Sequence, residues 1–338
     1  MKIGIIGCGA ITRFRHAPEC ESNPNIEVAG FFDLVEGRAG EMVEIYGGKV
    51  YSAYEDMLED AEVDGVIVCT SNATHAEVTI KSLEAGKHVL CEKPLSTTVA
   101  DGIAMSKTAV KASRLLMIAQ NQRYDIAHVK AKEIIGSGVL GKVISFKSEF
   151  SHSGPENWGI DKTKSTWFFN KNTAILGAMG DLGVHKIDLM RWMLEEEFIN
   201  ISAIVGSFDK KDAEGEPIKV DDNSLCLLET DGGIIGTVNA SWSNYGLVEN
   251  STTIYCTDGV IKIYAAPLHE IKVIRKNGEN ILYELPEQTR SGVVDAFERA
   301  IANGWESPIS AEDAVKTLKV VFAAIEAAES GKKVTVQY

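Results

Sequence analysis

Short apolar runs alternate with helical patterns through the first third of the chain, and this alternation constrains the fold more than any other feature. The apolar runs predict strands at residues 2–6, 28–33, 65–70, 87–92 and 115–119. The segments between them have helical spacing near residues 11–21, 36–46, 74–85 and 98–113. Near-continuous apolar runs indicate strands buried on both faces, and the intervening helices imply right-handed crossovers. The sequence therefore predicts an α/β fold that begins with a parallel, doubly wound sheet.

The pattern changes near Asn121, and we place a domain boundary there, with domains at residues 1–121 and 122–338. A helical pattern follows near residues 126–135, and residues 142–150 then alternate like a half-buried strand with Ile144 on the same side as Phe146. Further runs are spaced like antiparallel strands joined by tight turns, at residues 224–230, 233–243, 252–257 and 259–265. Such a sheet usually leaves one face open to water or to a partner.

A last strong helix is predicted over residues 311–328. It opens at Ser310, a good N-cap residue, and has two acidic residues in its first turn. It ends at Ser330-Gly331, where glycine suits the left-handed conformation that closes many helices.

The composition excludes several classes of function. The chain of 338 residues carries 34 Lys plus Arg against 48 Asp plus Glu, a formal charge of −14, and no basic cluster opposes it. Such a chain repels phosphate backbones and anionic lipid, so we expect neither nucleic acid nor membrane as a partner. The start MKIGIIG enters a strand at once, and no run approaches the roughly 20 apolar residues of a membrane helix. Six scattered cysteines without C-x-x-C pairs indicate reduced thiols in a cytoplasmic protein.

The stretch GCGAIT, residues 7–12, follows the first predicted strand and opens a helix. Gly7 would allow the tight turn, and Gly9 would let the backbone approach a pyrophosphate at the positive end of the helix. Thr12 replaces the third glycine of the dinucleotide fingerprint, so the motif is incomplete. The strand–turn–helix order around it nevertheless favours a dinucleotide site.

Asp33 stands at the end of the second predicted strand, about 20 residues beyond the glycines. A carboxylate at this place accepts hydrogen bonds from the adenosine ribose and repels a 2′-phosphate, which favours NAD over NADP. Two alternatives stay open. Asp33 could instead cap a helix before Val35-Glu36-Gly37, and the nearby Arg38 keeps NADP possible.

Two more stretches end predicted strands at the same edge of the sheet. TSNATH, residues 70–75, offers small hydrogen-bonding side chains to a ribose, and it also fits a turn that caps the next helix. CEKP, residues 91–94, would project Lys93 into the crevice between the domains, with Pro94 making its turn rigid. Taken alone, such a lysine is more often a solvated turn residue.

The stretch GDLGVHKIDL, residues 180–189, has helical spacing that places Asp181, His185 and Asp188 on one face. An acid one turn from an imidazole can share a proton-transfer task, because the carboxylate stabilises the imidazolium. Alternatively, Asp181 pairs with the helix dipole, His185 is a core histidine, or the set holds a metal. No further His or Cys cluster lies at ligand spacing, so we expect no metal.

Together with NQRYD at residues 121–125, these stretches resemble the Gfo/Idh/MocA family of glucose–fructose oxidoreductases and inositol dehydrogenases. The resemblance spans nearly the whole chain, and CEKP followed by D-x-G-x-H-x-x-D is its most specific part. It implies an N-terminal Rossmann domain that binds NAD(P) and a C-terminal α/β domain with an open, mostly antiparallel sheet. It also implies a small sugar- or polyol-type substrate, and a homodimer or homotetramer formed through the C-terminal sheet.

By this resemblance, Lys93, Asp181 and His185 form the catalytic set for hydride transfer between nicotinamide and a secondary alcohol or carbonyl. We expect His185 to act as general base, Asp181 to orient it and Lys93 to stabilise the alkoxide, although Lys93 and His185 could exchange roles. The expected cofactor contacts are Gly7, Gly9, Ala10, Ile11, Asp33, Arg38, Thr70, Ser71, Asn72, His75, Glu92, Lys93, Asn121 and Trp167. The expected substrate contacts are Lys93, Arg123, Trp167, Asp181 and His185.

Two rival functions share this fold. A sugar-responsive regulator would bind the same ligands without turnover, but such proteins tend to lose the lysine, aspartate or histidine that are all present here. A glycosidase-like relative that uses NAD through transient oxidation normally carries additional catalytic residues, which we do not identify. The sequence therefore favours a dehydrogenase or reductase. The substrate wall is expected within residues 151–178, which contain His152, Asn157, Trp158, Asp161, Lys162, Lys164 and Trp167.

Overall fold

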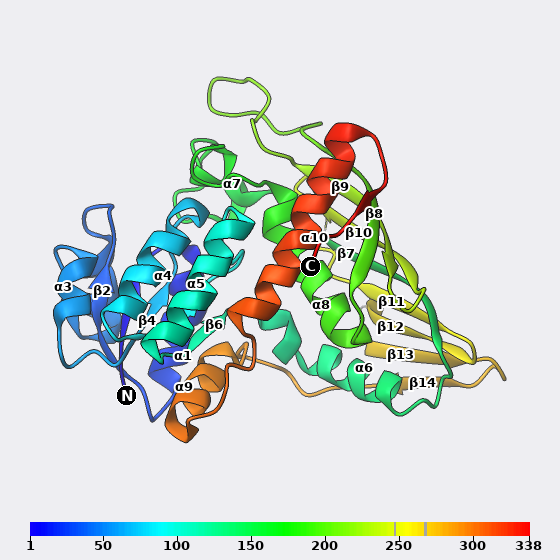
Figure 1. Cartoon of the computed structure of the whole chain (residues 1–338), viewed down its shortest axis with the longest axis horizontal. Coiled ribbons are helices and arrows are strands. Elements are labelled where there is room, and N and C mark those ends of the chain that lie inside the picture. Colours follow the sequence, from blue (N-terminus) through cyan, green and yellow to red (C-terminus); the bar gives the residue numbers. More distant parts are fainter. Residues whose placement is uncertain (247, 267–268) are drawn as a thin grey trace.

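The chain folds around two β-sheets that stand side by side, joined by a long helix (Figure 1). The computed structural model describes residues 1–246, 248–266 and 269–338. No helix in these ranges is long and apolar enough to cross a membrane.

The first sheet is parallel, with strand order β3-β2-β1-β4-β5-β6. Its strands are β1 (Lys2–Ile6), β2 (Glu27–Phe32), β3 (Lys49–Val50), β4 (Gly65–Val68), β5 (His88–Cys91) and β6 (Leu116–Ile118). The predicted α/β fold with a doubly wound sheet is confirmed, and the five predicted strands are all present. The two-residue edge strand β3 was not predicted, because both of its residues are exposed and give no buried pattern.

Helices cover both faces of the first sheet. They are η1 (Thr12–His16), α1 (Ala17–Ser22), α2 (Arg38–Tyr46), α3 (Tyr54–Glu59), η2 (Asn72–Thr74), α4 (His75–Glu84), α5 (Val99–Ala112) and η3 (Asn121–Tyr124). The helical predictions are confirmed to within a few residues, apart from the short α3, which was not predicted. Thr98 caps α5 by accepting a hydrogen bond from the backbone N–H of Asp101.

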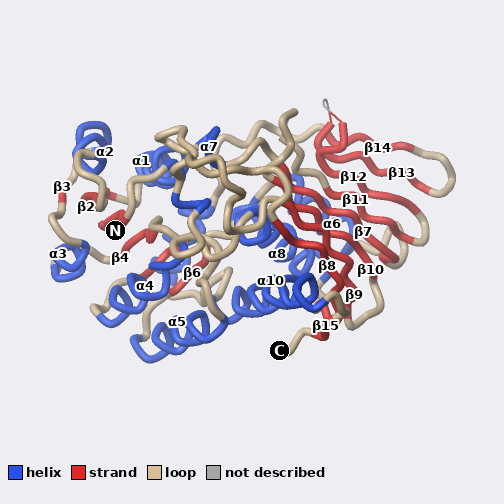
Figure 2. Tube along the Cα trace, turned by 90° about the horizontal axis from the view of Figure 1, so that it is seen from above, coloured by secondary structure: helices blue, strands red, loops and turns tan. Residues whose placement is uncertain are grey.

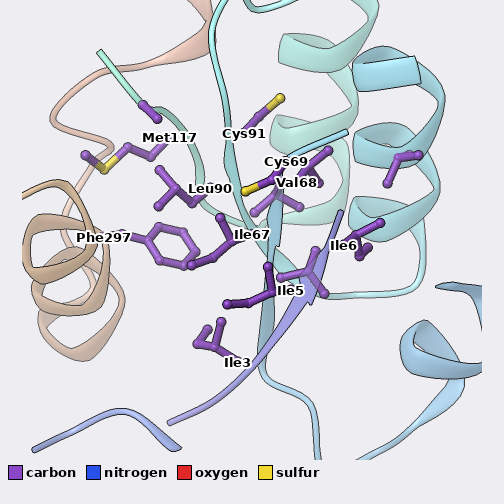
Figure 3. Close-up of a cluster of buried hydrophobic side chains, with 14 of the residues drawn as sticks. Ile3, Ile5, Ile6, Ile67, Val68, Cys69, Leu90, Cys91, Met117 and Phe297 are labelled. Carbon is purple, nitrogen blue, oxygen red and sulfur yellow. The ribbon is translucent and has the colours of Figure 1, made fainter. Parts of the chain in front are cut away.

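The core of the first sheet includes a helix from the far end of the chain. Phe297 of α9 (Val293–Asn303) is fully buried and lies beside Ile67 and Leu90 of the central strands (Figure 3). The hydrophobic side chains around it, such as Ile3 and Val68, are also fully buried. The first domain therefore completes its core with residues far beyond Asn121, and the boundary at residue 121 remains a prediction.

The second sheet is mostly antiparallel, with strand order β14-β13-β12-β11-β7-β10-β9-β8-β15. Among the described strands of this sheet, only β7 and β10 pair in parallel. The strands are β7 (Val143–Ser151), β8 (Phe198–Gly206), β9 (Asn223–Thr230), β10 (Ile235–Ser241), β11 (Thr252–Cys256), β12 (Gly259–Ala266), β13 (His269–Arg275), β14 (Asn280–Tyr283) and β15 (Val334–Thr335). Strands β7 and β9 to β12 were predicted. The others were missed, because β8 lies half-buried with little alternation and β14 is a short, exposed edge.

Helices lie along one face of the second sheet and leave its other face bare (Figure 2). The remaining helices are α6 (Ile126–Gly136), α7 (Pro155–Trp158), η4 (Trp167–Phe169), η5 (Met179–Gly183), α8 (Val184–Leu194) and α10 (Ala311–Ser330). Helix α10 joins the domains: Ala314 and Val315 belong to the first core, whereas Val320 and Val321 belong to the second. Ser310 caps it through the N–H of Asp313, as predicted.

Ile144 departs from the predicted burial of β7. Phe146 and Ser148 are buried as the alternation predicts, whereas Ile144 is 51% exposed. The pairing of β7 with β11 shifts register between Tyr255 and Cys256, opposite this end of the strand. A bulge of this kind turns the end of the strand away from the core.

Candidate active site

A crevice of about 350 Å³ lies between the domains, at the carboxyl ends of the first sheet's strands. This is where doubly wound folds bind their ligands. The predicted contacts that line it are Gly9, Ala10, Ile11, Arg38, Thr70, Asn72, His75, Glu92, Lys93, Trp167 and Asp181. The second domain closes the crevice with the segment between Pro155 and Phe168.

The phosphate loop has the geometry that the glycines predict. Gly7 adopts a φ of +98°, and a Cβ there would lie 2.5 Å from the carbonyl oxygen of Cys69, so only glycine fits. A Cβ on Gly9 would meet nothing within 4 Å, so the protein leaves open space where a pyrophosphate would approach the backbone. Thr12 is fully buried and donates a hydrogen bond to the carbonyl of Gly7, at 2.5 Å, which ties the turn to the helix.

Asp33 is fixed by two backbone groups. Its carboxylate accepts hydrogen bonds from the N–H of Cys8, at 2.6 Å, and from the N–H of Val35, at 2.7 Å. Helix α2 begins only at Arg38, after Gly37, and Asp33 provides no cap to it. The alternative of a helix-capping aspartate is therefore wrong, and Asp33 is held at the end of β2, where an adenosine ribose binds in such folds.

Arg38 forms an ion pair with Asp161 of the second domain, with 2.5 Å between Nη2 and Oδ2. Both residues line the crevice. The pair joins the domains across the end of the crevice nearest Asp33. It also engages the guanidinium that a 2′-phosphate would need, so the pair, like Asp33, favours NAD over NADP.

Lys93 makes the central contact of the crevice. Its Nζ donates hydrogen bonds to Oδ1 of Asp181, at 2.7 Å, and to the backbone carbonyl of Asp181, at 2.9 Å. Both side chains are largely buried, with 14% and 8% of their surfaces exposed. The lysine follows β5, before a cis peptide to Pro94, and the aspartate belongs to the second domain. The predicted projection of Lys93 into the crevice is what the structure shows.

Two residues hold or approach the other oxygen of Asp181. Trp242 is fully buried and donates from Nε1 to Oδ2 at 3.1 Å. Nε2 of His152 lies 3.9 Å from the same oxygen, and Nδ1 of His152 accepts a hydrogen bond from the N–H of Gly154. Nothing in the sequence distinguishes Trp242, which follows an apolar strand, from an ordinary core residue, and His152 was predicted only as part of the substrate wall.

The segment that carries Asp181 is not a regular α-helix. Residues Met179–Gly183 form a π-helix, whose wider turn moves positions i and i+4 out of line. The carboxylate turns to Lys93 and Trp242, and within the described residues it makes no hydrogen bond or ion pair with His185. The predicted contact between Asp181 and His185 is therefore wrong, although both residues lie close to Lys93.

Asp221 fixes the start of this π-helix. Its carboxylate accepts hydrogen bonds from the N–H groups of Gly177, at 2.8 Å, and Met179, at 2.6 Å. Burial raises the pKa of Asp221 to about 6, although these backbone bonds oppose the shift. A Cβ on Gly177 would lie 1.7 Å from the carbonyl of Asp221, so the close approach requires glycine.

His185 is buried at the start of α8, with its ring 5.9 Å from that of Phe150. Its Nδ1 is enclosed and has no partner among the described residues. Burial lowers the pKa of His185 well below the usual range, and the positive charges of Lys93, Arg15 and Lys186 lower it further. The imidazole is therefore neutral at physiological pH and able to accept a proton.

Glu92 forms a buried pair with His16, with 2.7 Å between Oε1 and Nε2. Burial by itself would raise the pKa of Glu92. The hydrogen bond to His16 and the charges of His16, Arg15 and Lys93 outweigh this effect and lower the pKa to about 2. Glu92 is thus an anion that lies at the wall of the crevice beside Lys93.

Other predicted contacts have structural partners. Asn72 donates from Nδ2 to the carbonyl of Ala174, so it joins the domains, and Ser71 precedes the short helix η2. The ring of His75 lies between the carbonyl oxygens of Pro94 and Thr70, and burial lowers its pKa.

Arg123 is not a substrate contact in this structure. Its guanidinium donates two hydrogen bonds to Asp188, at 2.7 and 2.6 Å, and one to Asp313. Only 9% of the arginine side chain is exposed. The predicted substrate role is corrected to a buried ion pair, which also accounts for Asp188. Asn121 lines a separate hollow with Phe14.

An aromatic wall closes the crevice on the side of the second domain. Trp167 stacks on Phe168, with 3.8 Å between ring centroids, and Trp158 meets Phe168 edge-on at 5.3 Å. Phe168 also meets Trp242 edge-on, at 6.2 Å. Flat apolar faces of this kind suit the C–H faces of a sugar ring. In the described ranges, no three His, Cys, Asp or Glu side chains lie close enough to hold a metal ion.

Family models match both domains of the chain. Residues 1–120 match the oxidoreductase family with an NAD-binding Rossmann fold, and residues 128–262 match the C-terminal domain of the same family. The chain belongs to the Gfo/Idh/MocA oxidoreductase family. Its first domain is an NAD-binding domain, as the phosphate loop and Asp33 predict.

Proteins of similar sequence match this chain over its whole length or over part of it. Myo-inositol 2-dehydrogenase of Thermotoga maritima is 28% identical, with 100% of this chain and 99% of that protein covered. Glucose-6-phosphate 3-dehydrogenase of Bacillus subtilis is 33% identical, but the match covers 65% of this chain and 62% of that protein. The fold matches a levoglucosan dehydrogenase solved with NADH and levoglucosan, with a TM-score of 0.88, 23% identity and full coverage of both chains.

Replacing Asp161 by Asn tests the role of the Arg38 ion pair in nucleotide selection. The substitution frees the guanidinium, so we expect NADPH to bind about threefold more tightly, in keeping with the roughly 0–1 kcal/mol that exposed ion pairs contribute. NADH affinity should change less. Fluorescence titration of both nucleotides measures this, with Glu36→Gln as a control that removes an exposed charge from the same region. Equal NADPH affinities in the three proteins would rule out the selection role.

The Glu92–His16 pair predicts how stability depends on pH. The pKa of Glu92 is lower in the folded protein than its usual 4.5, so the pair stabilises the fold above that pH and loses its effect as the pH falls toward 2. Glu92→Gln should therefore cost on the order of 3 kcal/mol near pH 7 and less near pH 4. Denaturant unfolding at both pH values measures the difference, with the exposed Glu84→Gln as control. A cost that does not change with pH would contradict the assignment.

Proposed function

We propose that this protein is an NAD-dependent dehydrogenase that oxidises a secondary alcohol of a sugar or polyol to a ketone, and reduces the ketone in the reverse direction. The observation that carries the proposal is the Lys93–Asp181 ion pair, which spans the crevice of an NAD-binding fold beside the neutral His185. The relatives named as inositol, glucose-6-phosphate and levoglucosan dehydrogenases support this substrate class.

The residues of the first domain fit a bound dinucleotide. The backbone at Gly9 would face the pyrophosphate, and Asp33 would accept hydrogen bonds from the adenosine ribose. Thr70 and Glu92 line the part of the crevice beside Lys93, where the nicotinamide end would lie. When bound, NAD⁺ would supply the acceptor that takes a hydride ion, one proton with two electrons, from the substrate carbon.

The proton leaves the substrate hydroxyl as the C–O bond becomes a carbonyl. In our proposal Nε2 of His185 takes this proton, because Nδ1 is enclosed and the neutral ring has a free lone pair. Nζ of Lys93 donates a hydrogen bond to the same oxygen and stabilises its developing negative charge. Asp181 holds Lys93 in place, and Trp242 holds Asp181.

Substituting the proposed catalytic residues should reduce turnover far more than it affects folding. We expect Lys93→Met and His185→Gln each to lower kcat by about 10²–10⁴-fold, the usual contribution of positioned proton transfer or charge stabilisation. NADH oxidation and NAD⁺ reduction across a panel of sugars, inositols and their ketones would measure it. Lys107→Met, an exposed lysine on α5, is the matched control.

The same panel separates the enzyme from its rival. Turnover that survives in Lys93→Met would contradict the proposed catalytic role. NADH binding that a sugar alters, without turnover in the wild type, would instead assign the protein to the sugar-responsive regulators. A loss in His185→Gln much smaller than in Lys93→Met would indicate that the two residues exchange roles.

We also propose that the protein assembles into a homodimer or homotetramer through the bare face of the second sheet. Large apolar side chains project from neighbouring strands on this face: Ile204 from β8, Leu225 and Leu227 from β9, and Ile235 from β10, each more than half exposed. A second copy of the chain could cover the same patch with its own, since a two-fold interface is self-complementary.

The double variant Leu225→Glu with Leu227→Glu tests this interface. Four carboxylates would meet across a two-fold axis without partners, so we expect a monomer where the wild type is an oligomer. Light scattering coupled to size exclusion measures the mass. Val110→Glu on α5, which is 79% exposed, controls for added charge. An unchanged oligomer would place the interface elsewhere.

The cysteines support a cytoplasmic location for the enzyme. All six are free and buried: Cys8, Cys20, Cys69, Cys91, Cys226 and Cys256. Burial is the main cause that raises the pKa of Cys8 and Cys20 to about 12, so these thiols resist oxidation. Unpaired thiols are typical of a reducing compartment.

A further inference from the structure

Lys186 is a buried lysine without a partner. It follows His185 in α8, none of its surface is exposed, and its Nζ has no hydrogen-bond partner among the described residues. Burying an unpaired ammonium in an apolar interior is strongly unfavourable. A charge kept at that cost is uncommon away from functional sites.

The groups around Lys186 do not neutralise it. The acids that face it are Asp125 before α6, Glu149 on β7 and Glu249, and among described residues none lies within ion-pair distance. Asp125 accepts hydrogen bonds from the N–H of Ala127 and from Tyr264.

His128 of α6 is also close enough to Lys186 to feel its charge. Burial is the main cause that lowers the pKa of His128 to about 4, and the charge of Lys186 lowers it further. Nδ1 of His128 donates to the carbonyl of Gln122, and Nε2 has no partner in the described chain. His128 is therefore neutral at physiological pH and adds no countercharge.

Phe150 stands next to both Lys186 and His185. Nζ of Lys186 lies 6.0 Å from the centroid of the Phe150 ring, and the ring of His185 lies 5.9 Å from the same centroid. His152 meets the ring edge-on at 6.2 Å. An aromatic ring screens charge far less than water does, so the charge of Lys186 acts strongly on the imidazole.

We propose that Lys186 is a positioning residue of the active site: its buried charge adds to the effect of burial in keeping His185 neutral and thereby available to accept the substrate proton. The benefit to catalysis rests on the proposed dehydrogenase function, whereas the effect of Lys186 on the protonation of His185 does not depend on it. Lys186 touches no substrate and acts only through His185. The other charges that face His185 are Lys93 and Arg15.

The proposal predicts the pH range in which Lys186 affects the protonation of His185. Burial lowers the pKa of Lys186 to about 7, so the lysine carries its charge below neutral pH, the range in which His185 takes up its proton. Without that charge, the imidazolium forms at a higher pH. The acid limb of kcat/KM should then move to higher pH, because the base form is lost earlier.

The experiment measures the protonation of His185 directly, without turnover. NMR titration of ¹³C-histidine-labelled protein, with His185 assigned from its missing signal in His185→Gln, compares the wild type with Lys186→Met, Lys186→Gln and Lys186→Arg. We expect His185 to titrate about one pH unit higher in the Met and Gln variants, a tenfold change in its protonation constant, and to stay as in the wild type with Arg. Lys107→Met is the control.

The variants should fold, because methionine fills the site of the lysine without the cost of a buried charge. If Arg does not fit, agreement between Met and Gln still assigns the effect to charge. An unchanged His185 titration in both Met and Gln overturns the proposal, whatever the turnover. A shift in the His185 titration without turnover on any polyol supports the role of Lys186 but contradicts the dehydrogenase function. A shift in the titration together with a matching shift in the acid limb of kcat/KM supports the role of Lys186 and the dehydrogenase function.

Discussion

The ion pair between Lys93 and Asp181 is the interaction on which the site depends. It brings the end of β5 to the π-helix of the second domain, and it is nearly enclosed by protein. Breaking a buried pair leaves an uncompensated charge, which costs far more than an exposed pair contributes. The crevice therefore has a defined width only while this pair is intact, and each group that holds Asp181, including Trp242 and the segment anchored by Asp221, maintains that width.

Much of the fold was predictable from the sequence, and the reason lies in burial. Strands covered on both faces, such as Lys2–Ile6 and Gly65–Val68, must be apolar throughout, so their pattern stands out locally. Strands at the edge of the second sheet have no such requirement. The exposed, two-residue strand Lys49–Val50 and the half-buried strand Phe198–Gly206 are defined by the neighbours they pair with, which no local window contains.

In the functional site, too, the roles that depend on local sequence were predictable and those that depend on distant partners were not. Gly7 and Lys93 were predictable, because their roles depend on the turn that directly follows a strand. The role of Arg123 was not, since a charged residue does not reveal whether its partner will be a ligand or Asp188. The predicted orientation of Asp181 was wrong because it assumed a regular α-helix, whereas the segment is a π-helix. Trp242 could not be predicted as a partner, because it lies far along the chain from the carboxylate that it holds. Electrostatic roles need distances, and a sequence contains none.

Helix α10 has a mechanical consequence for the two domains. Its first turns are packed into one core through Val315, and its middle turns into the other through Val320, within a single unbroken rod. A hinge movement that opened the crevice between the domains would pull one of these residues out of its core. Twisting one domain about the axis of the helix would turn one of these residues out of its core in the same way. Helix α10 therefore opposes both movements, and the two domains should keep the same relative orientation while a ligand enters or leaves the crevice between them.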